Sequence, residues 1–173
     1  VVEEAKKISH KIDEKEINNR LDLRNEEIFT IDGEDAKDLD DAIFVKKNND
    51  GNYILGVHIA DVSYYVGEGS NLDKEAIIRG TSIYMMDRVI PMLPRELSNG
   101  ICSLNAKEDR LAMSVIMEIN KDGKVISSDI KKSVIRVTER MNYSDVTKIL
   151  KKSDEEVVKK YEKYIAHFEL MNE

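Results

Sequence analysis

The sequence predicts an α+β fold, with a mixed, antiparallel-dominated sheet built from two β-hairpins and with helices packed on it. Two turn signals carry this prediction, because Asn49-Asp50-Gly51 and Lys121-Asp122-Gly123 each separate two apolar, β-type stretches. A third observation is the helical spacing of apolar residues towards the end of the chain. Hairpins in one part of a chain and helices in another are typical of α+β proteins.

The first third of the chain reads as a lead-in followed by strands. Residues 1–25 are charged and are expected to form a partly helical lead-in segment. A short strand is expected over 26–31. The first hairpin has its arms at 40–48 and 52–60. The second arm is nearly all apolar, so we expect a central strand that ends at Asp61.

The middle of the chain predicts one helix and one irregular segment. Ser70 is a good capping residue, and acidic residues follow it in the first turn, so a helix is expected from there to about Gly80. Both prolines of the chain, Pro91 and Pro94, lie in residues 84–94. We therefore expect a rigid, irregular loop over this segment.

The last third predicts the second hairpin and two helices. The hairpin arms are expected at 110–119 and 124–137, and the helices at 143–152 and 154–173. The last helix has a regular apolar face, formed by Val157, Tyr161, Tyr164, Ile165 and Phe168.

Length and composition indicate one globular domain. The chain has 173 residues, of which 41% are hydrophobic and 35% charged. We find no apolar run long enough to cross a membrane and no signal peptide, so no membrane partner is expected. The single cysteine, Cys102, lies in an apolar setting and is expected to be a core residue without a disulfide partner. These features favour a reducing, cytoplasmic compartment.

The formal net charge of −7 argues, taken alone, against a nucleic-acid partner. Basic residues nevertheless gather in two places, at Lys131, Lys132, Arg136 and Arg140, and at Lys148, Lys151 and Lys152. A solvated face explains these clusters as well as a phosphate-binding surface does. The chain lacks an initiator methionine, which favours a piece of a longer protein.

The most informative segment is residues 32–41, in which six of ten residues are acidic. Apolar, β-type residues flank it on both sides, which places the acids in a loop between buried strands. Carboxylates crowded in this way repel one another, and a hard cation such as Mg²⁺ removes that repulsion. A solvated acidic loop is the plainer alternative.

The spacing of the acids limits how they can converge. In an extended segment, Asp38 and Asp40 would share one face while Asp41 would point away. Convergence of these three residues with Asp32 therefore requires an irregular loop. The calcium-hand pattern does not fit, because no glycine follows at the required position.

Three blocks of sequence carry a family resemblance. Residues 30–42 (Thr-Ile-Asp-Gly-Glu-Asp-Ala-Lys-Asp-Leu-Asp-Asp-Ala) closely resemble the catalytic signature of the ribonuclease II/ribonuclease R family. Residues 56–66 and then 90–104 are similar to the next blocks of its RNB-type catalytic domain. The Gly-Glu-Asp-Ala form of the signature is closer to ribonuclease R. Several blocks in family order, between about residues 20 and 150, are a far more specific signal than one acidic motif.

The resemblance implies a hydrolytic, processive, Mg²⁺-dependent 3′→5′ exoribonuclease that releases nucleoside 5′-monophosphates in RNA degradation. It also implies that the four aspartates of the signature are catalytic and bind the metal, and these are Asp32, Asp38, Asp40 and Asp41. Tyr84 matches the tyrosine that packs the 3′-terminal nucleotide. The expected partner is therefore the 3′ end of a single-stranded RNA.

By this resemblance, residues 26–173 are the amino-terminal half of the catalytic domain. The family's second half supplies a further arginine, a glutamate and a base-clamping aromatic, and accessory RNA-binding barrels flank the domain. None of these is visible in the sequence. We therefore expect the 173-residue chain alone to be inactive.

Two further residues, His58 and Asp61, lie in and directly after the apolar second arm of the first hairpin. His58 lies in a nearly continuous apolar strand, which favours a core histidine over a metal ligand. Asp61, at the end of that strand, is a candidate for hydrogen-bond support of a metal ligand.

Two other classes of function stay open on the residues alone. A metal-dependent phosphatase or sugar-phosphate enzyme could use the same aspartates, although no nucleophile motif is evident. Activity on mononucleotides rather than oligonucleotides would identify it. A non-catalytic RNA-binding module is the third possibility, and it predicts lost carboxylates, whereas all four are present.

Overall fold

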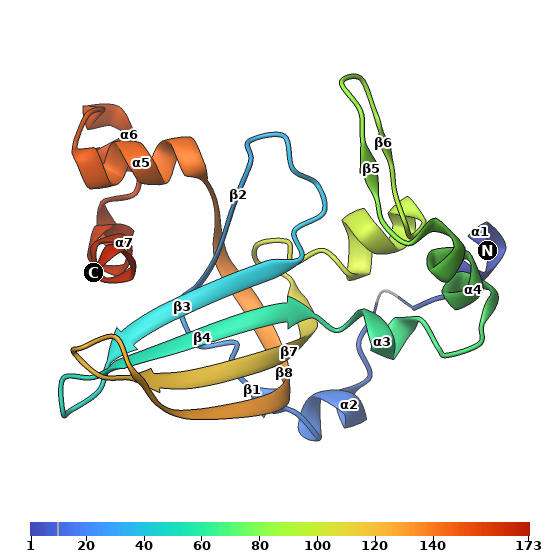
Figure 1. Cartoon of the computed structure of the whole chain (residues 1–173), viewed down its shortest axis with the longest axis horizontal. Helices are drawn as coiled ribbons and strands as arrows, with labels where there is room; N and C mark the ends of the chain where they lie inside the picture. The colour runs from blue at the N-terminus through green and yellow to red at the C-terminus, as the bar shows by residue number, and fades with distance from the viewer. Residues whose placement is uncertain (10) are drawn as a thin grey trace.

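The computed structural model describes residues 1–9 and 11–173 and has a six-stranded mixed sheet at its centre (Figure 1). The strand order is β1–β8–β2–β3–β4–β7. The bounds of these strands are β1 Leu21–Asp22, β2 Ile28–Asp32, β3 Asp41–Lys47, β4 Tyr53–Ala60, β7 Asp109–Ile119 and β8 Val125–Asn142. With helices at both ends of the sheet, the predicted α+β class is confirmed.

Both predicted hairpins form, and their turns are built alike. In the β3–β4 turn, Asn48 Oδ1 accepts hydrogen bonds from the backbone N–H groups of Asp50 and Asn52. Asn120 does the same in the β7–β8 turn. The glycine of each turn has a positive φ, 78° at Gly51 and 77° at Gly123, which glycine adopts at little steric cost.

Strand β8 closes the sheet on itself. It pairs antiparallel with β7 along Val125–Arg136 and then runs parallel to β2 along its last residues. Since β2, β3, β4 and β7 also pair in sequence, the five strands form a closed ring. The sequence pattern predicted the end of this arm at residue 137, whereas the strand continues to Asn142. That extension carries the parallel pairing, which no local signal reveals.

The interior of the ring is a core that includes Ile28, Leu39, Phe44, Leu104 and Ile135, each at most 3% exposed. Strand β4 has a neighbour on each side, β3 and β7, as the apolar pattern predicted.

The cross-strand partner of Phe44 is a glycine. Phe44 lies opposite Gly56, and a Cβ added at Gly56 would come within 2.2 Å of the Phe44 ring. Any side chain at this position would therefore displace the ring from the core.

Short helices cover the amino-terminal side of the fold. The α-helices are α1 Val2–Ala5, α2 Glu14–Asn18, α3 Val62–Tyr65 and α4 Asn71–Arg79, and a π-helical turn, η1, spans Leu97–Ile101. The predicted helix is α4, whose N-cap Ser70 accepts a hydrogen bond from the Asp73 N–H at 3.1 Å. It ends at Gly80, which has a left-handed conformation. The sequence did not predict α3 or η1.

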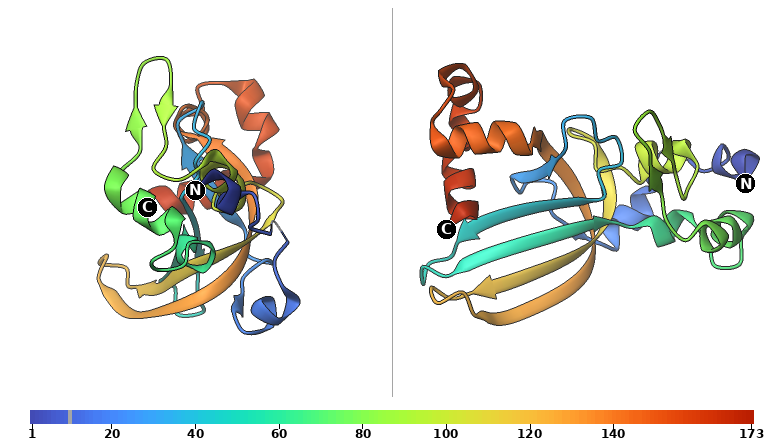
Figure 2. Two further views of the ribbon diagram at one scale, coloured as in Figure 1. Left: turned by 90° about the vertical axis from the view of Figure 1, so that its right-hand side faces the viewer. Right: turned by 45° about the horizontal axis from the view of Figure 1, so that its top comes forward.

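The irregular loop predicted over residues 84–94 is wrong in its first part. Strands β5 (Ile83–Tyr84) and β6 (Val89–Ile90) form a small antiparallel hairpin that projects from the body of the molecule (Figure 2). Pro91 and Pro94 follow β6, so neither removes a hydrogen bond from it. The hairpin residues are exposed, from 36% at Val89 to complete exposure at Met86.

The helix predicted over 143–152 is α5 (Tyr143–Lys151), but the single helix predicted over 154–173 is wrong. That segment is divided into α6 (Glu155–Lys160), a 3₁₀ turn η2 (Glu162–Tyr164) and α7 (Ile165–Asn172). The chain bends at Tyr161 and Tyr164, and the bend lets Tyr164 and Phe168 both contact Phe29 of β2, with ring centroids 5.0 and 5.1 Å apart. Aromatic packing therefore outweighs helix continuity here.

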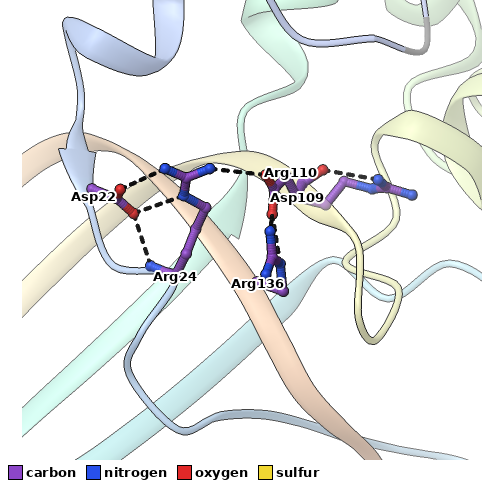
Figure 3. Close-up of polar contacts among 5 residues, drawn as sticks. All are labelled: Asp22, Arg24, Asp109, Arg110 and Arg136. Carbon is purple, nitrogen blue, oxygen red and sulfur yellow. Dashed lines mark hydrogen bonds and ion pairs between the residues drawn. The ribbon is translucent and has the colours of Figure 1, made fainter. Parts of the chain in front are cut away.

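Ion pairs connect the lead-in segment, residues 1–25, to the rest of the fold. On the surface, Arg24 bridges Asp22 and Asp109, and Arg136 contacts the other oxygen of Asp109 (Figure 3). Deeper in the fold, Arg20 contacts Asp61 at 2.7 Å, and each side chain is only 1% exposed.

The part of the chain that the structure describes includes no helix with the length and apolarity needed to span a membrane.

Candidate active site

The acidic segment forms the connection between β2 and β3. Asp32 is the last residue of β2, and Asp41 is the first residue of β3. Asp38 and Asp40 lie in the irregular stretch between the strands, as their predicted convergence required. Between them, Leu39 is 1% exposed and belongs to the core, so it anchors the loop, while Asp38 is partly buried and Asp40 is more exposed.

Residues distant in sequence hold the second half of this loop. The Ser103 hydroxyl accepts a hydrogen bond from the Leu39 N–H at 3.0 Å, and the Leu104 N–H donates to the Leu39 carbonyl at 2.8 Å. The Asp40 carbonyl accepts from the Ala60 N–H at the end of β4. These bonds tie the loop to the core without using any aspartate side chain.

Arg140 of β8 holds the first half of the loop. Its Nη2 atom donates to the carbonyl oxygens of Glu34 and Ala36, at 2.8 and 2.6 Å. The sequence placed Arg140 in a basic cluster but could not show that it faces the acidic loop. Its neighbour Arg136 pairs instead with Asp109.

The four aspartates of the signature act on one another electrostatically. Burial, followed by the charges of Asp41 and Asp38, raises the pKa of Asp32, and Arg140 opposes this shift. Burial, followed by the charges of Asp38, Asp41 and Asp32, raises the pKa of Asp40. The structure thus brings the four predicted residues into one negative field.

The donor atoms and the negative charge of this loop suit a hard cation. The donors are carboxylate oxygens, their mutual repulsion is only partly compensated, and the buried Oδ2 atom of Asp32 has no hydrogen-bond partner. Among the described residues, no three acidic, histidine or cysteine side chains are arranged closely enough to hold a metal ion as they stand. If Mg²⁺ binds at this loop, the residues that would hold it are the four aspartates, whose side chains do not form a metal-binding group as they stand.

Tyr84 reaches this site from the β5–β6 hairpin. Its hydroxyl donates a hydrogen bond to Oδ2 of Asp38, and this bond raises the pKa of Tyr84 to about 12. The side chain is otherwise open to solvent, with the residue 64% exposed. An aromatic ring therefore lies beside the carboxylates with much of its surface free.

Two buried residues have the roles expected of core residues. His58 is fully buried, and its Nδ1 atom is 2.6 Å from Ser114 Oγ. Burial lowers the pKa of His58 to about 4, so it is neutral at physiological pH. Cys102 is 3% exposed, and burial raises the pKa of its thiol to about 12, which leaves it unreactive.

The expected role of Asp61 as support for a metal ligand is wrong. Its carboxylate pairs with Arg20 and accepts a hydrogen bond from the Ser63 hydroxyl at 2.8 Å. Arg20, which the sequence did not single out, comes from the lead-in segment.

The protein is thus an α+β domain with a closed mixed sheet. Its candidate site is a loop with the four signature aspartates, and an aromatic side chain lies beside that loop. The chain belongs to the RNB domain family, whose model matches residues 20–173.

Similar proteins support this assignment. The chain is 52% identical over 173 residues to Ribonuclease R 1 of Lactococcus lactis subsp. lactis (strain IL1403). This match covers 100% of the chain and 21% of the relative. It is 56% identical over 164 residues to Ribonuclease R of Thermotoga maritima, covering 95% of the chain and 23% of the relative. The chain thus spans about a fifth of the length of these relatives.

The same fold occurs in a solved structure, Mycoplasma genitalium RNase R in complex with double-stranded RNA. The two superpose with a TM-score of 0.85 at 35% sequence identity, over 89% of this chain and 27% of the other.

Proposed function

We propose that this chain is the amino-terminal half of the catalytic domain of a Mg²⁺-dependent exoribonuclease. The proposed enzyme hydrolyses RNA processively from the 3′ end, releases nucleoside 5′-monophosphates and acts in the cytoplasm. The observation that carries the proposal is the loop between β2 and β3, where burial and the charges of the other three aspartates raise the pKa of Asp40 and the Tyr84 hydroxyl bonds Asp38. The ribonuclease R relatives supply the reaction class.

The aspartates answer the main difficulty of phosphodiester hydrolysis. A phosphate is itself an anion, so it is repelled by the carboxylates unless positive charge lies between them. When bound, Mg²⁺ supplies that charge and lowers the pKa of an attacking water. In this proposal, Asp32, Asp38, Asp40 and Asp41 orient the cation and thereby the phosphate, because the loop that carries them is fixed at both ends to the sheet.

Tyr84 supplies the contact with the end of the RNA. Stacking of a base on an aromatic ring contributes roughly 1–3 kcal/mol and tolerates any base, which suits an exonuclease. The Tyr84 hydroxyl bond to Asp38 holds the ring beside the proposed site of hydrolysis. A terminal base on this ring would place the adjacent phosphate near the acidic loop.

We also propose that the chain functions as part of a longer protein and is not active alone. Its relatives are four to five times as long, given that it covers 21% and 23% of their lengths. The net charge of −7 disfavours RNA binding by this part alone. In this proposal, further residues and RNA-binding domains come from the rest of that protein.

The direction and products of the reaction test the proposal. The longer protein is incubated with Mg²⁺ and an oligoribonucleotide labelled at its 5′ end. We expect the labelled full-length RNA to be converted to a short labelled end product with few intermediates, as a processive enzyme requires, together with unlabelled nucleoside 5′-monophosphates. Release of the labelled 5′ nucleotide at the start would show the opposite direction. Release of inorganic phosphate from mononucleotides, without attack on the oligonucleotide, would favour the phosphatase alternative.

A further inference from the structure

One hydroxyl group bonds both peptide units that flank Asp38. The Ser103 Oγ atom donates to the Lys37 carbonyl at 3.1 Å and accepts from the Leu39 N–H at 3.0 Å. The first contact fixes the peptide unit before Asp38, and the second fixes the peptide unit after it. The backbone of Asp38 is therefore restrained on both sides by a single, fully buried side chain.

Ser103 is itself held in place. The Arg110 Nε atom donates to the Ser103 carbonyl at 2.8 Å, and Arg110 is 5% exposed. Figure 3 shows the Arg110 side chain directed away from the Asp109–Arg136 pair. The next residue, Leu104, bonds the Leu39 carbonyl through its own N–H. A hydroxyl on such a rigid support is suited to hold a loop in one conformation.

The loop needs such a restraint because its carboxylates carry the same charge and repel one another. Six of the ten residues 32–41 are acidic, and Arg140 bonds the loop at the carbonyl oxygens of Glu34 and Ala36. Without a restraint, repulsion would move the Asp38 side chain away from its neighbours. A basic side chain could also hold it, but would neutralise the charge that a cation requires. Ser103 is neutral, and its hydroxyl bonds the acidic loop only through backbone groups, so it leaves the Asp38 carboxylate available. The same hydroxyl also lies 3.5 Å from Asn105 Oδ1, outside the loop.

We propose that Ser103 is a positioning residue, which holds Asp38 in the geometry that allows the acidic loop to bind a divalent cation. This inference rests on the proposed function, since it assigns a cation to the four aspartates. It adds to the proposed site a residue that lies 65 positions after Asp38 in the sequence. Ser103 acts through the backbone of the loop rather than through contact with the ion or the RNA.

The test compares Ser103→Ala with Ser114→Ala. Ser114 is an equally buried serine, and its hydroxyl bonds His58 and Ser133 inside the sheet, so its loss also removes buried hydrogen bonds but leaves the loop untouched. Ser103→Cys is the second variant, because it fills the space with a weakly hydrogen-bonding group and avoids a cavity. Mn²⁺ is the probe, since it accepts the same oxygen ligands as Mg²⁺ and its binding is measured by paramagnetic relaxation.

Two readouts are taken on the folded chain, namely the Mn²⁺ affinity and the hydrogen-exchange protection of the Leu39 amide. We expect Ser103→Ala to lower both by about tenfold, Ser103→Cys to lower both in the same direction, and Ser114→Ala to change neither. If Ser103→Ala does not fold, Ser103→Cys decides the question by the same two readouts.

The outcomes separate this inference from the proposed function. If the wild-type chain binds Mn²⁺ and the Ser103 variants bind it equally well, the positioning role is overturned while the cation site stands. An equal loss of affinity in Ser114→Ala would also overturn it, because the effect would then be one of general stability. If Mn²⁺ does not broaden the Asp38 and Asp40 amides of the wild-type chain, the cation site fails and the positioning role fails with it.

Discussion

The hydroxyl of Tyr84 donates a hydrogen bond to the carboxylate of Asp38, joining an exposed hairpin to an acidic loop 46 residues earlier in the chain. The two segments rise on the same side of the sheet (Figure 1). This contact explains how a projecting hairpin can take part in a site that is otherwise formed between β2 and β3. It also separates two contributions of Tyr84, namely its ring and its hydroxyl.

Substitutions at Tyr84 distinguish these contributions in the longer protein. We predict that Tyr84→Ala leaves longer limit products than wild type, because a stacking contact of roughly 1–3 kcal/mol for the terminal base is lost. Tyr84→Phe retains the ring but loses the bond to Asp38, so its limit product is expected to be nearer to that of wild type than the product of Tyr84→Ala. Gel separation of the end products from a single-stranded RNA measures both. An unchanged shortest product in Tyr84→Ala would make Tyr84 an ordinary surface residue.

The charge of Asp32 should destabilise the fold at neutral pH. Because the pKa of Asp32 is raised in the folded state, the folded protein favours the protonated form more than the unfolded chain does. The penalty is therefore absent below the ordinary pKa of 3.8 and fully present above the raised value. We predict that Asp32→Asn increases the free energy of unfolding at pH 7 by about 0.5–1 kcal/mol, allowing for solvent screening.

Urea denaturation at pH 7 and near pH 4 checks this prediction. The gain should shrink at the lower pH, and Asp35→Asn, an exposed change in the same loop, should show no such gain. A loss of stability in Asp32→Asn at pH 7 would show that the attraction of the Arg140 charge outweighs burial and repulsion.

The buried ion pair between Arg20 and Asp61 should be important for stability. Removing one partner of such a pair leaves the other charge buried, and this typically costs about 3–5 kcal/mol. We predict a loss of this size for Asp61→Ala in urea denaturation. The control is Glu3→Ala, which breaks the exposed Lys6–Glu3 pair and should change stability by at most about 0.5 kcal/mol. Equal effects of the two substitutions would contradict the structure.

The chain alone should not degrade RNA. We predict no processive release of mononucleotides by the 173-residue chain, measured beside the longer protein at equal concentration with Mg²⁺. The reason is that transition-state charge on the phosphate needs a positioned basic group as well as a cation, and Arg140 is already bonded to loop carbonyls. Degradation by the chain at a comparable rate would show that the remainder is dispensable.

Local signals predicted much of this fold. The turns at Gly51 and Gly123 were recognisable because a short asparagine-to-glycine turn needs few residues and a positive φ. The Ser70 cap was recognisable for the same reason, since its hydrogen-bond partner lies three residues away. The acidic loop was predicted from its composition and its apolar flanks, and the structure places its four aspartates in one field.

Features that depend on distant residues were not predictable. The contacts that shape the loop join Leu39 to Ser103, 64 residues away, and Ala36 to Arg140, 104 residues away. The break near Tyr161 and Tyr164 was missed because those residues have helical spacing in the sequence, whereas the packing of Tyr164 and Phe168 on Phe29 involves a distant strand. Asp61 was misread because its partner, Arg20, comes from the lead-in.

Substitution of Asp40 in the longer protein tests most directly whether the acidic loop is the catalytic centre. Asp40→Asn retains the size of the side chain but removes one negative charge from the site, and Asp35→Asn removes a charge from the same loop outside the four aspartates. With Mg²⁺ and a labelled oligoribonucleotide, the proposed site predicts that Asp40→Asn lowers turnover by about 100-fold or more with RNA affinity nearly unchanged, while Asp35→Asn retains both. Turnover of Asp40→Asn within tenfold of wild type would contradict it.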